Sequence, residues 1–336
     1  MTIRWGFLGA SWIASTALAP AVHAASNARL QAVASRDPMR SMALEPITMH
    51  NSYDELLADP QVDAVYISLA NHLHCEWSIK ALKAGKHVLC EKPFATNSAQ
   101  ARLMADAALA NDRLLVEAIW TRWHPRFARM VDLIHGGTIG ELRAIDSAFT
   151  FPGSLEGNYR LAPEMGGGSL LDVGPYQVHT WIALAGANAD LAISAVDRNI
   201  GSTGVDLTTQ ITGHFTKDVE VKAVTSFERS EEQNLLITCT EAKIEFAGNE
   251  AFTSWNSTST LRIGNDQEEF AAIDPFRVMI ENIGSRINGE ESWLPSLSES
   301  IRVMELLDQI RLWTMLGSNQ KTREIPTKHP PPKDAV

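Results

Sequence analysis

Residues 86–93 of this chain read Lys-His-Val-Leu-Cys-Glu-Lys-Pro and carry its clearest chemical potential. The Glu91-Lys92-Pro93 triplet directly follows an apolar, strand-like run. A lysine at the end of such a strand can lie beside a bound ligand and hold or move a proton. A solvated lysine before a proline is the more ordinary interpretation of an isolated triplet, so the rest of the chain decides between them.

A second set of proton-handling side chains follows a run of three glycines at 166–168. Asp172 and Tyr176 are four residues apart, a spacing that places both on one face of a helix. A phenol has a reference pKa of about 10 and is a poor base at neutral pH. A neighbouring ammonium group lowers that pKa. A lysine close to such a phenol would therefore form an acid–base pair with it for a hydroxyl proton.

A nucleotide-binding turn is indicated near the start of the chain. Gly9, Ser11 and Ala14 stand where a dinucleotide fold has Gly-x-Gly-x-x-Gly/Ala. Gly9 permits the tight turn, Ala14 is small enough for close packing, and the Ser11 hydroxyl can bind phosphate. The N–H groups that begin the following helix would face a pyrophosphate; they belong to Ser11, Trp12 and Ile13. On this motif alone, an ordinary glycine turn of an α/β protein stays an alternative.

The end of the second predicted strand bears on which dinucleotide fits. It reads Ser35-Arg36-Asp37, and Arg40 lies one helical turn further on. A guanidinium can stack on adenine and pair bidentately with a 2′-phosphate, which favours NADP. Asp37 keeps NAD possible, because a shift of one residue would place its carboxylate on the ribose 2′-OH.

Composition narrows the class of protein. A length of 336 residues predicts two domains, and 45% apolar with 21% charged residues is typical of soluble globular proteins. The formal net charge of -11 argues against a nucleic-acid surface and a basic membrane face. Three scattered cysteines without a Cys-x-x-Cys pair indicate reduced thiols in the cytoplasm and no metal site. The apolar N-terminal run is interrupted by Ser11, Ser15 and Pro20, so a strand, turn and helix are preferred over a signal peptide.

Strand-like and helix-like segments alternate through the first third of the chain, which predicts βαβ units and a parallel sheet. The predicted strands are 3–8, 30–35, 62–68, 87–90 and 114–118. The predicted helices are 11–24, 53–57 with Ser52 as N-cap, 74–84 and 97–111.

After about residue 122 the pattern changes to strands without helices between them, which predicts an antiparallel sheet. A helix over 125–135 comes first, then strands at 142–151, 193–198, 208–215, 220–227, 234–240 and 243–246, and a closing helix at 298–316. We therefore expect a dinucleotide-binding domain at 1–121 and a substrate-binding and oligomerisation domain at 122–336. A disordered tail is predicted at about 326–336.

Four motifs in this order resemble the Gfo/Idh/MocA oxidoreductases, most closely the branch of dimeric dihydrodiol dehydrogenase and NADP-dependent D-xylose dehydrogenase. They are Glu-Lys-Pro at 91–93, Glu-Ala-Ile-Trp-Thr-Arg at 117–122, the run from Gly166 to Tyr176, and Leu-Ser-Glu-Ser at 297–300. The resemblance implies an α/β protein: an N-terminal Rossmann domain plus a C-terminal α/β domain with a large, mostly antiparallel open sheet.

The resemblance also implies roles for single residues. Lys92 corresponds to the catalytic lysine, Tyr176 to the acid/base residue, and Asp172 to an acidic position that would orient Lys92 or bind a substrate hydroxyl. The cofactor is expected to bind the glycine turn and Ser35, Arg36 and Arg40 after the second strand. It is also expected to bind Asn71 and His74, from a loop in which Ala70 replaces the usual proline, and Glu91 with Lys92. Three side chains are candidates for substrate contact: Trp120, Arg160 and His179.

The resulting expectation is a dehydrogenase or reductase acting on CH–OH groups, with NADP favoured and NAD possible. It would transfer a hydride to or from a sugar, polyol or dihydrodiol. A nucleotide-bound regulator without catalysis is one alternative, which Lys92, Asp172 and Tyr176 argue against. Glycoside cleavage through transient oxidation by bound NAD is the other, and Arg36 and Tyr176 argue against it. We expect a homodimer or higher even oligomer formed through the open sheet, and no nucleic-acid or membrane partner.

Overall fold

The computed structural model describes residues 1–153, 155–216, 218–246, 248, 251–253 and 255–313, and the backbone of 321 and 322. Its contacts divide the chain into two compact units. The first contains Met1–Arg129, Trp255–Thr258 and Phe270–Glu305, and the second contains Met130–Ser254, Ser259–Glu269 and Leu306–Val336. Segments from late in the chain thus belong with the first unit, and a single boundary after residue 121 stays a prediction. The tail predicted at 326–336 lies outside the described residues.

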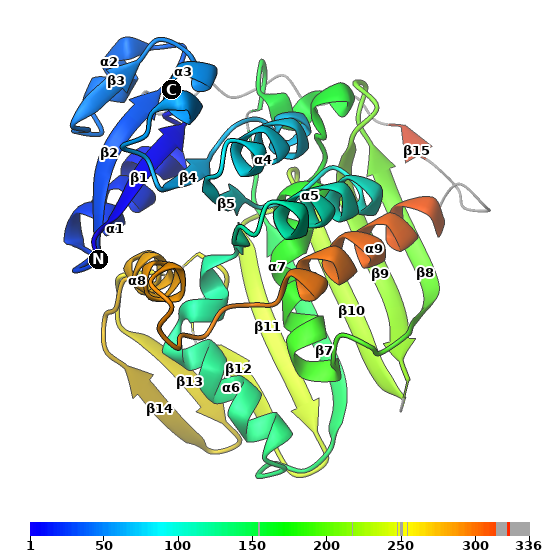
Figure 1. The fold of residues 1–336 in the computed structure, drawn as a ribbon. Coiled ribbons are helices and arrows are strands. Elements are labelled where there is room, and N and C mark those ends of the chain that lie inside the picture. Colours follow the sequence, from blue (N-terminus) through cyan, green and yellow to red (C-terminus); the bar gives the residue numbers. More distant parts are fainter. Residues whose placement is uncertain are drawn as a thin grey trace. The chain divides into compact units, whose positions relative to one another are not determined.

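A six-stranded parallel sheet forms the centre of the first unit, in the order β3-β2-β1-β4-β5-β6 (Figure 1). Its strands are β1 (Ile3–Leu8), β2 (Ala28–Ala34), β3 (Thr48–His50), β4 (Ala64–Ile67), β5 (His87–Glu91) and β6 (Leu115–Ala118). The five predicted strands and the parallel pairing are confirmed, and β3 is an addition. Most strand residues are buried, as expected where helices cover both faces of a parallel sheet.

Helices connect these strands: α1 (Ala19–Ala24), α2 (Pro38–Met42), α3 (Tyr53–Ala58), α4 (His74–Lys83) and α5 (Ser98–Ala110). The predicted cap is confirmed, since the Ser52 hydroxyl accepts the Glu55 N–H at 3.1 Å. A π-helical segment, η1 (Ala14–Leu18), precedes α1. Pro20 has no N–H to offer a regular helical ladder, and a π-turn is one way in which a helix adapts to that. A helix that the sequence did not predict, α8 (Pro275–Ile287), packs against α1 and β2.

A nine-stranded sheet forms the centre of the second unit, in the order β14-β13-β12-β11-β7-β10-β9-β8-β15. The strands are β7 (Leu142–Thr150), β8 (Leu191–Ile200), β9 (Asp206–Phe215), β10 (Val219–Ser226), β11 (Glu232–Cys239), β12 (Lys243–Phe246), β13 (Ser259–Ile263), β14 (Asp266–Phe270) and β15 (Lys321–Thr322). Two pairs of neighbouring strands are parallel: β7 with β10, and β8 with β15. The antiparallel pairs are β8–β9, β9–β10, β7–β11, β11–β12 and β12–β13. The predicted, mostly antiparallel sheet is therefore confirmed.

One face of this sheet is covered by α7 (Ser169–Ala185), which packs across β7, β9 and β10 (Figure 1). Along β10, Val219, Val221 and Ala223 are buried while Glu220 and Lys222 are exposed. That alternation has a period of two, so the opposite face of the sheet carries the polar side chains.

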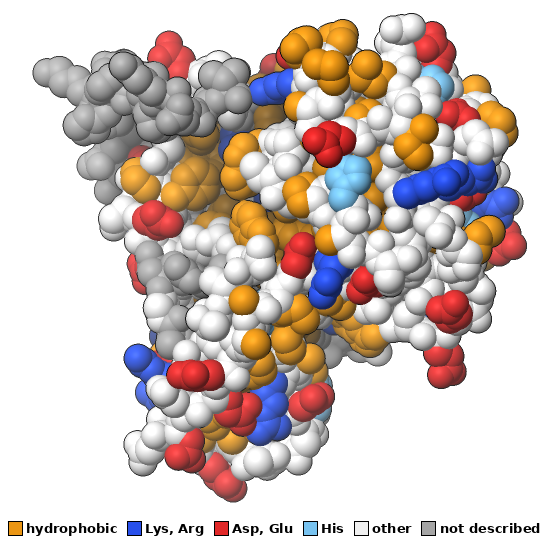
Figure 2. Space-filling view, turned by 90° about the vertical axis from the view of Figure 1, so that its left-hand side faces the viewer, with side chains coloured by type: hydrophobic (Ala, Val, Ile, Leu, Met, Phe, Trp, Pro, Cys, Tyr) orange, Lys and Arg blue, Asp and Glu red, His pale blue; other side chains and the backbone are white. Residues whose placement is uncertain are grey.

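Two further helices contain residues of both units: α6 (Pro125–His135) and α9 (Leu297–Trp313). Both were predicted, although residues 314–316 of the closing helix lie outside the described part of the chain. No helix of the described residues is long and apolar enough to cross a membrane. Acidic, basic and apolar side chains are interspersed over the face that Figure 2 displays.

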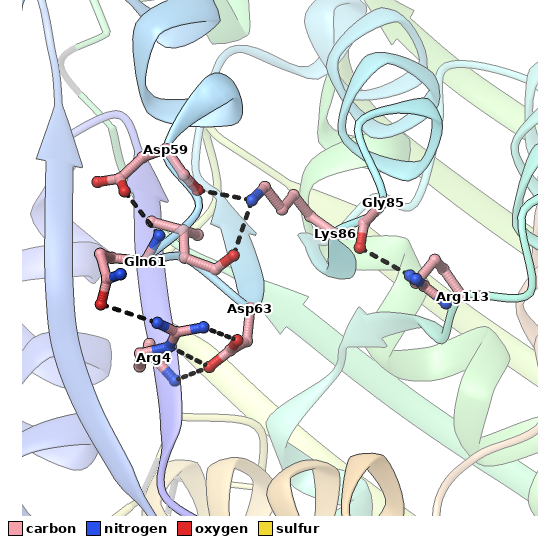
Figure 3. A network of polar contacts seen from close by, with 8 residues as sticks. Arg4, Asp59, Gln61, Asp63, Gly85, Lys86 and Arg113 are labelled. Carbon is pink, nitrogen blue, oxygen red and sulfur yellow. Dashed lines mark hydrogen bonds and ion pairs between the residues drawn. The ribbon is translucent and has the colours of Figure 1, made fainter.

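A polar network joins the amino ends of β1, β4 and β5 (Figure 3). Arg4 donates from Nε to Asp63 Oδ2 at 2.8 Å and from Nη2 to Asp63 Oδ1 at 2.6 Å. The ammonium group of the buried Lys86 donates to the carbonyl oxygens of Asp59 at 2.7 Å and Val62 at 2.8 Å. These bonds satisfy a charge that would be costly to bury alone. Burial raises the pKa of Asp63, but the hydrogen bonds and charge of Arg4 outweigh it and lower that pKa below the usual value.

This network predicts an acid-dependent contribution to stability. A carboxyl whose pKa is lowered in the folded state stabilises it above the unfolded pKa, and that stability is lost as pH falls through the folded pKa. Asp63→Asn should therefore lower the free energy of unfolding near pH 7, and the gap from wild type should narrow toward about pH 3. Urea unfolding across this range measures the gap, with the exposed Asp106→Asn on α5 as control. A gap that does not change with pH would contradict the prediction.

Candidate active site

Lys92 follows directly from β5, and its backbone is fixed by the neighbouring Glu91. The carboxylate of Glu91 accepts the Tyr66 hydroxyl at 2.7 Å through Oε1 and the Lys92 N–H at 3.2 Å through Oε2. Burial raises the pKa of Glu91 to about 7, although the Tyr66 hydrogen bond and the Lys92 charge oppose the rise. A carboxyl that titrates near neutral pH therefore adjoins the predicted catalytic lysine.

His74 holds two loops of the first unit together. Its Nδ1 lies 2.8 Å from the carbonyl oxygen of Pro93, and its Nε2 lies 3.0 Å from that of Leu69. The ring is completely buried, and burial lowers its pKa against these two hydrogen bonds. Glu117 of β6 adds a third tie by accepting the Phe94 N–H at 3.2 Å. In this structure the ring nitrogens of His74 contact the chain itself, and its predicted contact with the cofactor stays a prediction.

The glycine turn joins β1 to the helix that follows it. Gly9 has a φ of +95°, and a Cβ there would lie 3.0 Å from the carbonyl oxygen of Ser68. Both the left-handed backbone and the close approach therefore require glycine. The Ser11 hydroxyl accepts the Ala14 N–H at 3.2 Å, so it caps the start of the helix. Trp12 follows and is 66% exposed.

Arg36 and Asp37 follow β2, and from the sequence either one could contact the adenosine ribose. Asp37 Oδ1 accepts the backbone N–H groups of Met39 at 2.9 Å and Arg40 at 3.3 Å. The carboxylate therefore faces the start of α2, while the side chain of Arg36 is exposed. This arrangement favours the guanidinium as the group that would meet an incoming ribose phosphate.

The first unit contains an aromatic cluster that reaches Trp12 of the glycine turn. Trp120, in η3 (Trp120–Trp123), is 3% exposed, and its ring centroid lies 6.1 Å from that of Trp255 and 5.7 Å from that of Phe276. The ring of Trp12 lies 6.4 Å from Trp255. Sequence reasoning singled out Trp120 but missed Trp255 and Phe276, which come from distant segments with no motif of their own.

Asp172 and Tyr176 lie on α7 in the second unit, as their spacing predicts. Asp172 is 4% exposed and accepts Arg160 Nε at 2.8 Å. The Asp172 charge is the main cause of a raised pKa of Arg160, and the charges of Tyr159 and Tyr176 act in the same direction. Within this unit Arg160 thus supplies a cation to Asp172, and the expected pairing of Asp172 with Lys92 stays a prediction. Tyr176 packs against the rings of Phe149 and Phe252, at centroid distances of 5.6 and 6.1 Å.

The start of α7 depends on a carboxylate that sequence reasoning missed. Its N-cap, Gly168, has a φ of +111° and no side chain to cap the helix. Asp206 of β9 replaces that cap: Oδ2 accepts the Leu170 N–H at 2.8 Å and the Ser169 hydroxyl at 2.7 Å. A Cβ on Gly168 would lie 2.2 Å from Asp206 Oδ1. Gly168 is therefore required by its close packing against Asp206 inside the unit.

The remaining candidates occupy less accessible places. His179 of α7 is completely buried in the second unit, and Asn71 of η2 (Asn71–Leu73) is 3% exposed.

Cys75, Cys90 and Cys239 are free and buried. Among the described residues, no group of three or more His, Cys, Asp or Glu side chains could hold a metal ion.

The raised pKa of Glu91 predicts how stability depends on pH. A carboxyl whose folded pKa lies above its unfolded value binds a proton on folding, so stability falls as pH rises between the two values. Glu91→Gln keeps an acceptor for Tyr66 and cannot titrate. Relative to wild type, it should therefore gain about 2–3 kcal/mol between about pH 5 and pH 8, because the pKa moves from 4.5 to about 7. Urea unfolding measures this gain, and Glu290→Gln, at an exposed loop position, should show none.

The chain matches two family models. Residues 3–118 match the oxidoreductase family with an NAD-binding Rossmann fold, and residues 127–245 match the GFO/IDH/MocA C-terminal domain. The D-xylose 1-dehydrogenase (NADP(+)) 2 of Haloferax volcanii is 30% identical over 92% of this chain and 96% of that protein. An uncharacterized oxidoreductase of Rhizobium meliloti is 38% identical over 52% of this chain and 54% of its own length.

A third relative and a solved structure extend the comparison. The trans-1,2-dihydrobenzene-1,2-diol dehydrogenase of Mus musculus is 35% identical over 63% of this chain and 64% of that protein. A 3-ketoreductase from Actinomadura kijaniata, crystallised with NADP and TDP-benzene, has a TM-score of 0.86 and 27% identity; the match covers 97% of this chain and all of that one. With both of its sheets and most of its length accounted for in this way, the chain belongs to the Gfo/Idh/MocA oxidoreductases, a family with an NAD-binding Rossmann fold.

Proposed function

We propose that the protein is an NADP-dependent oxidoreductase that transfers a hydride between the nicotinamide and a secondary alcohol or carbonyl of a sugar, polyol or dihydrodiol. The observation that carries the proposal is the fixed Glu91-Lys92 loop, which stands at the end of β5, an interior strand of a dinucleotide-binding sheet. Two relatives named D-xylose 1-dehydrogenase (NADP(+)) and one named trans-1,2-dihydrobenzene-1,2-diol dehydrogenase support the substrate class.

The residues present fit a dinucleotide. The left-handed Gly9 and the helix start at Ser11, Trp12 and Ile13 would hold the pyrophosphate. Arg36, with Arg40, would hold the 2′-phosphate. Bound NADP supplies the hydride acceptor, and the chain supplies the proton chemistry: Tyr176 takes the hydroxyl proton, and the charge of Lys92 favours the phenolate.

The 3-ketoreductase offers support for this pairing. It was crystallised as variants in which a tyrosine was replaced by phenylalanine and a lysine by alanine or glutamate. Those two positions have the same separation in its sequence as Lys92 and Tyr176 have here. Asp172 would then act through Arg160, because these two side chains form an ion pair.

The activity is tested by following NADPH formation with a panel that contains D-xylose, other aldoses, polyols and a trans-dihydrodiol. Accumulation of NADPH in proportion to oxidised substrate supports the proposed reaction. Substrate turnover without net NADPH would indicate transient oxidation instead, and binding of NADP without turnover of any panel member would indicate a regulator.

Arg36→Ala should weaken NADP binding about tenfold or more and leave NAD nearly unchanged. A charge-assisted hydrogen bond contributes about 1.5–3 kcal/mol, and about 1.4 kcal/mol corresponds to a factor of ten. Titration of tryptophan fluorescence with each cofactor measures both constants. Equal losses for the two cofactors would show that Arg36 does not read the 2′-phosphate.

Lys92→Met and Tyr176→Phe should each reduce kcat by about two orders of magnitude, the usual scale for losing acid–base catalysis. Both variants should keep NADP affinity within a few fold, since neither residue is assigned to the adenosine half. The double variant should be little worse than the worse single one, because residues that act as a unit are not additive. A Tyr176→Phe enzyme with near-normal kcat would transfer the acid/base role to another residue, with Asp172 as the next candidate.

We also propose that the protein is a cytoplasmic homodimer or higher even oligomer, formed through the uncovered face of the nine-stranded sheet. Sheet register places Asp146, Lys222 and Thr212 in one row across β7, β10 and β9, with Leu236 of β11 beside Asp146. A broad sheet face of mixed polarity is suited to a twofold contact between copies. Its three buried, unpaired cysteines fit a reducing compartment.

Light scattering at micromolar concentration should therefore report twice the 36.9 kDa chain mass, or an even multiple of it. Lys222→Glu places like charges beside Asp146 in the row described and should shift the protein toward monomer. Lys83→Glu, at an exposed position near the end of α4, is the matched control and should leave the mass unchanged. A monomeric wild type would contradict the proposal.

A further inference from the structure

Asp37 stands at the tip of β2, where a dinucleotide-binding domain meets the adenosine ribose. Its backbone is extended, with φ of -118° and ψ of 106°, and it is the N-cap of α2. Its Oδ1 accepts two N–H groups of that short helix, from Met39 and Arg40. The carboxylate is thus turned into its own loop, in the geometry that a capping aspartate requires.

The hydroxyl of Ser35 anchors the other side of the same loop. It donates to the Asp37 carbonyl oxygen at 2.6 Å and accepts the Asp37 N–H at 3.2 Å. It also lies 2.8 Å from the hydroxyl of Ser41, which is 2% exposed. A hydroxyl has one hydrogen to donate and two lone pairs, so with Ser41 as donor the Ser35 hydroxyl is fully used within the loop.

Arg36 lies between these two anchored residues, and its side chain is exposed. Its charge acts on Tyr53, where it opposes the rise in the phenol pKa that burial causes. Tyr53, at the start of α3, packs edge-on against Trp77 at 4.9 Å between ring centroids. At adjacent exposed positions, the loop thus engages the Asp37 carboxylate in a helix cap and leaves the Arg36 side chain in solvent.

We infer that Asp37 is a positioning residue for cofactor selection: by capping α2 it withdraws its carboxylate from the ribose and holds Arg36 where a 2′-phosphate would bind. The inference rests on the proposed NADP-dependent function. A carboxylate directed at the ribose would favour NAD over NADP in two ways. It would accept a hydrogen bond from the 2′-OH of NAD, and it would repel the 2′-phosphate of NADP.

The experiment measures NADP and NAD affinities by fluorescence titration for wild type and the variants Asp37→Asn, Asp37→Ser and Asp37→Ala. Asparagine and serine also cap helices, whereas alanine does not. Loss of the cap costs about 1 kcal/mol, which corresponds to about fivefold weaker binding if the cap is needed only in the cofactor-bound state. We expect Asp37→Asn and Asp37→Ser to keep NADP affinity within about threefold, and Asp37→Ala to weaken it about fivefold with NAD unchanged. Ser35→Ala removes the second anchor and should weaken NADP in the same direction.

Two results would overturn the inference. Weaker NAD binding by both Asp37→Asn and Asp37→Ala would mean that the carboxylate holds the ribose. Tighter NADP binding by both would mean that its charge, and not its cap, governs the phosphate. Circular dichroism melts confirm that each variant is folded. A folded wild type that binds neither cofactor would instead overturn the proposed function, which separates the two failures.

Discussion

The level carboxyl ends of the parallel strands are the constraint on which the first unit depends. Register pairs Leu8 with Ala34 and with Ile67, and Ile67 with Cys90. Parallel strands that end together bring the loops after them to one edge, although these loops are far apart in the chain. The glycine turn, the Arg36 loop, the His74 loop and the Lys92 loop are neighbours for this reason. Every cofactor assignment in this unit follows from that shared edge.

Buried polar side chains then give that edge a defined shape. His74, Glu91 and Glu117 each contact backbone atoms of the loops, so main-chain groups that would otherwise be buried without partners are satisfied. The amino edge of the same sheet uses the same means: Asp63 accepts the backbone N–H of Arg4 in β1, and Lys86 donates to the carbonyl oxygens of Asp59 and Val62 in the segment before β4 (Figure 3). The two edges differ in their exposed side chains. At the carboxyl edge, Arg36 and Trp12 are exposed and are available to contact a ligand.

In the second unit, charged side chains from other segments fix the start of α7, which its own residues do not cap. Helix α7 begins at a glycine that cannot cap it, and the Asp206 carboxylate from β9 provides the missing acceptor. One turn further, Asp172 is buried and needs a cation, which Arg160 supplies from a preceding loop. Tyr176 is therefore presented by a helix whose start and first turn are both fixed by ion pairs or charged hydrogen bonds. Such bonds are stronger and more directional than neutral ones, which suits a residue that must be held in position.

The sequence by itself determined the features that depend on near neighbours. Periods of 2 and 3.6 located the strands and most helices, Ser52 marked a cap, and the order of four short motifs identified the family and the candidate lysine, aspartate and tyrosine. Tertiary structure decided the partners. Tyr66 with Glu91, Arg160 with Asp172, Asp206 with the start of α7, and α8 with α1 join residues 12 to more than 200 positions apart. Asp37 shows the division most clearly: its place at the strand end was visible in the sequence, but its direction was not. The direction of a side chain depends on which backbone groups lie within hydrogen-bond distance once the chain has packed. The order of residues along the chain does not specify those distances.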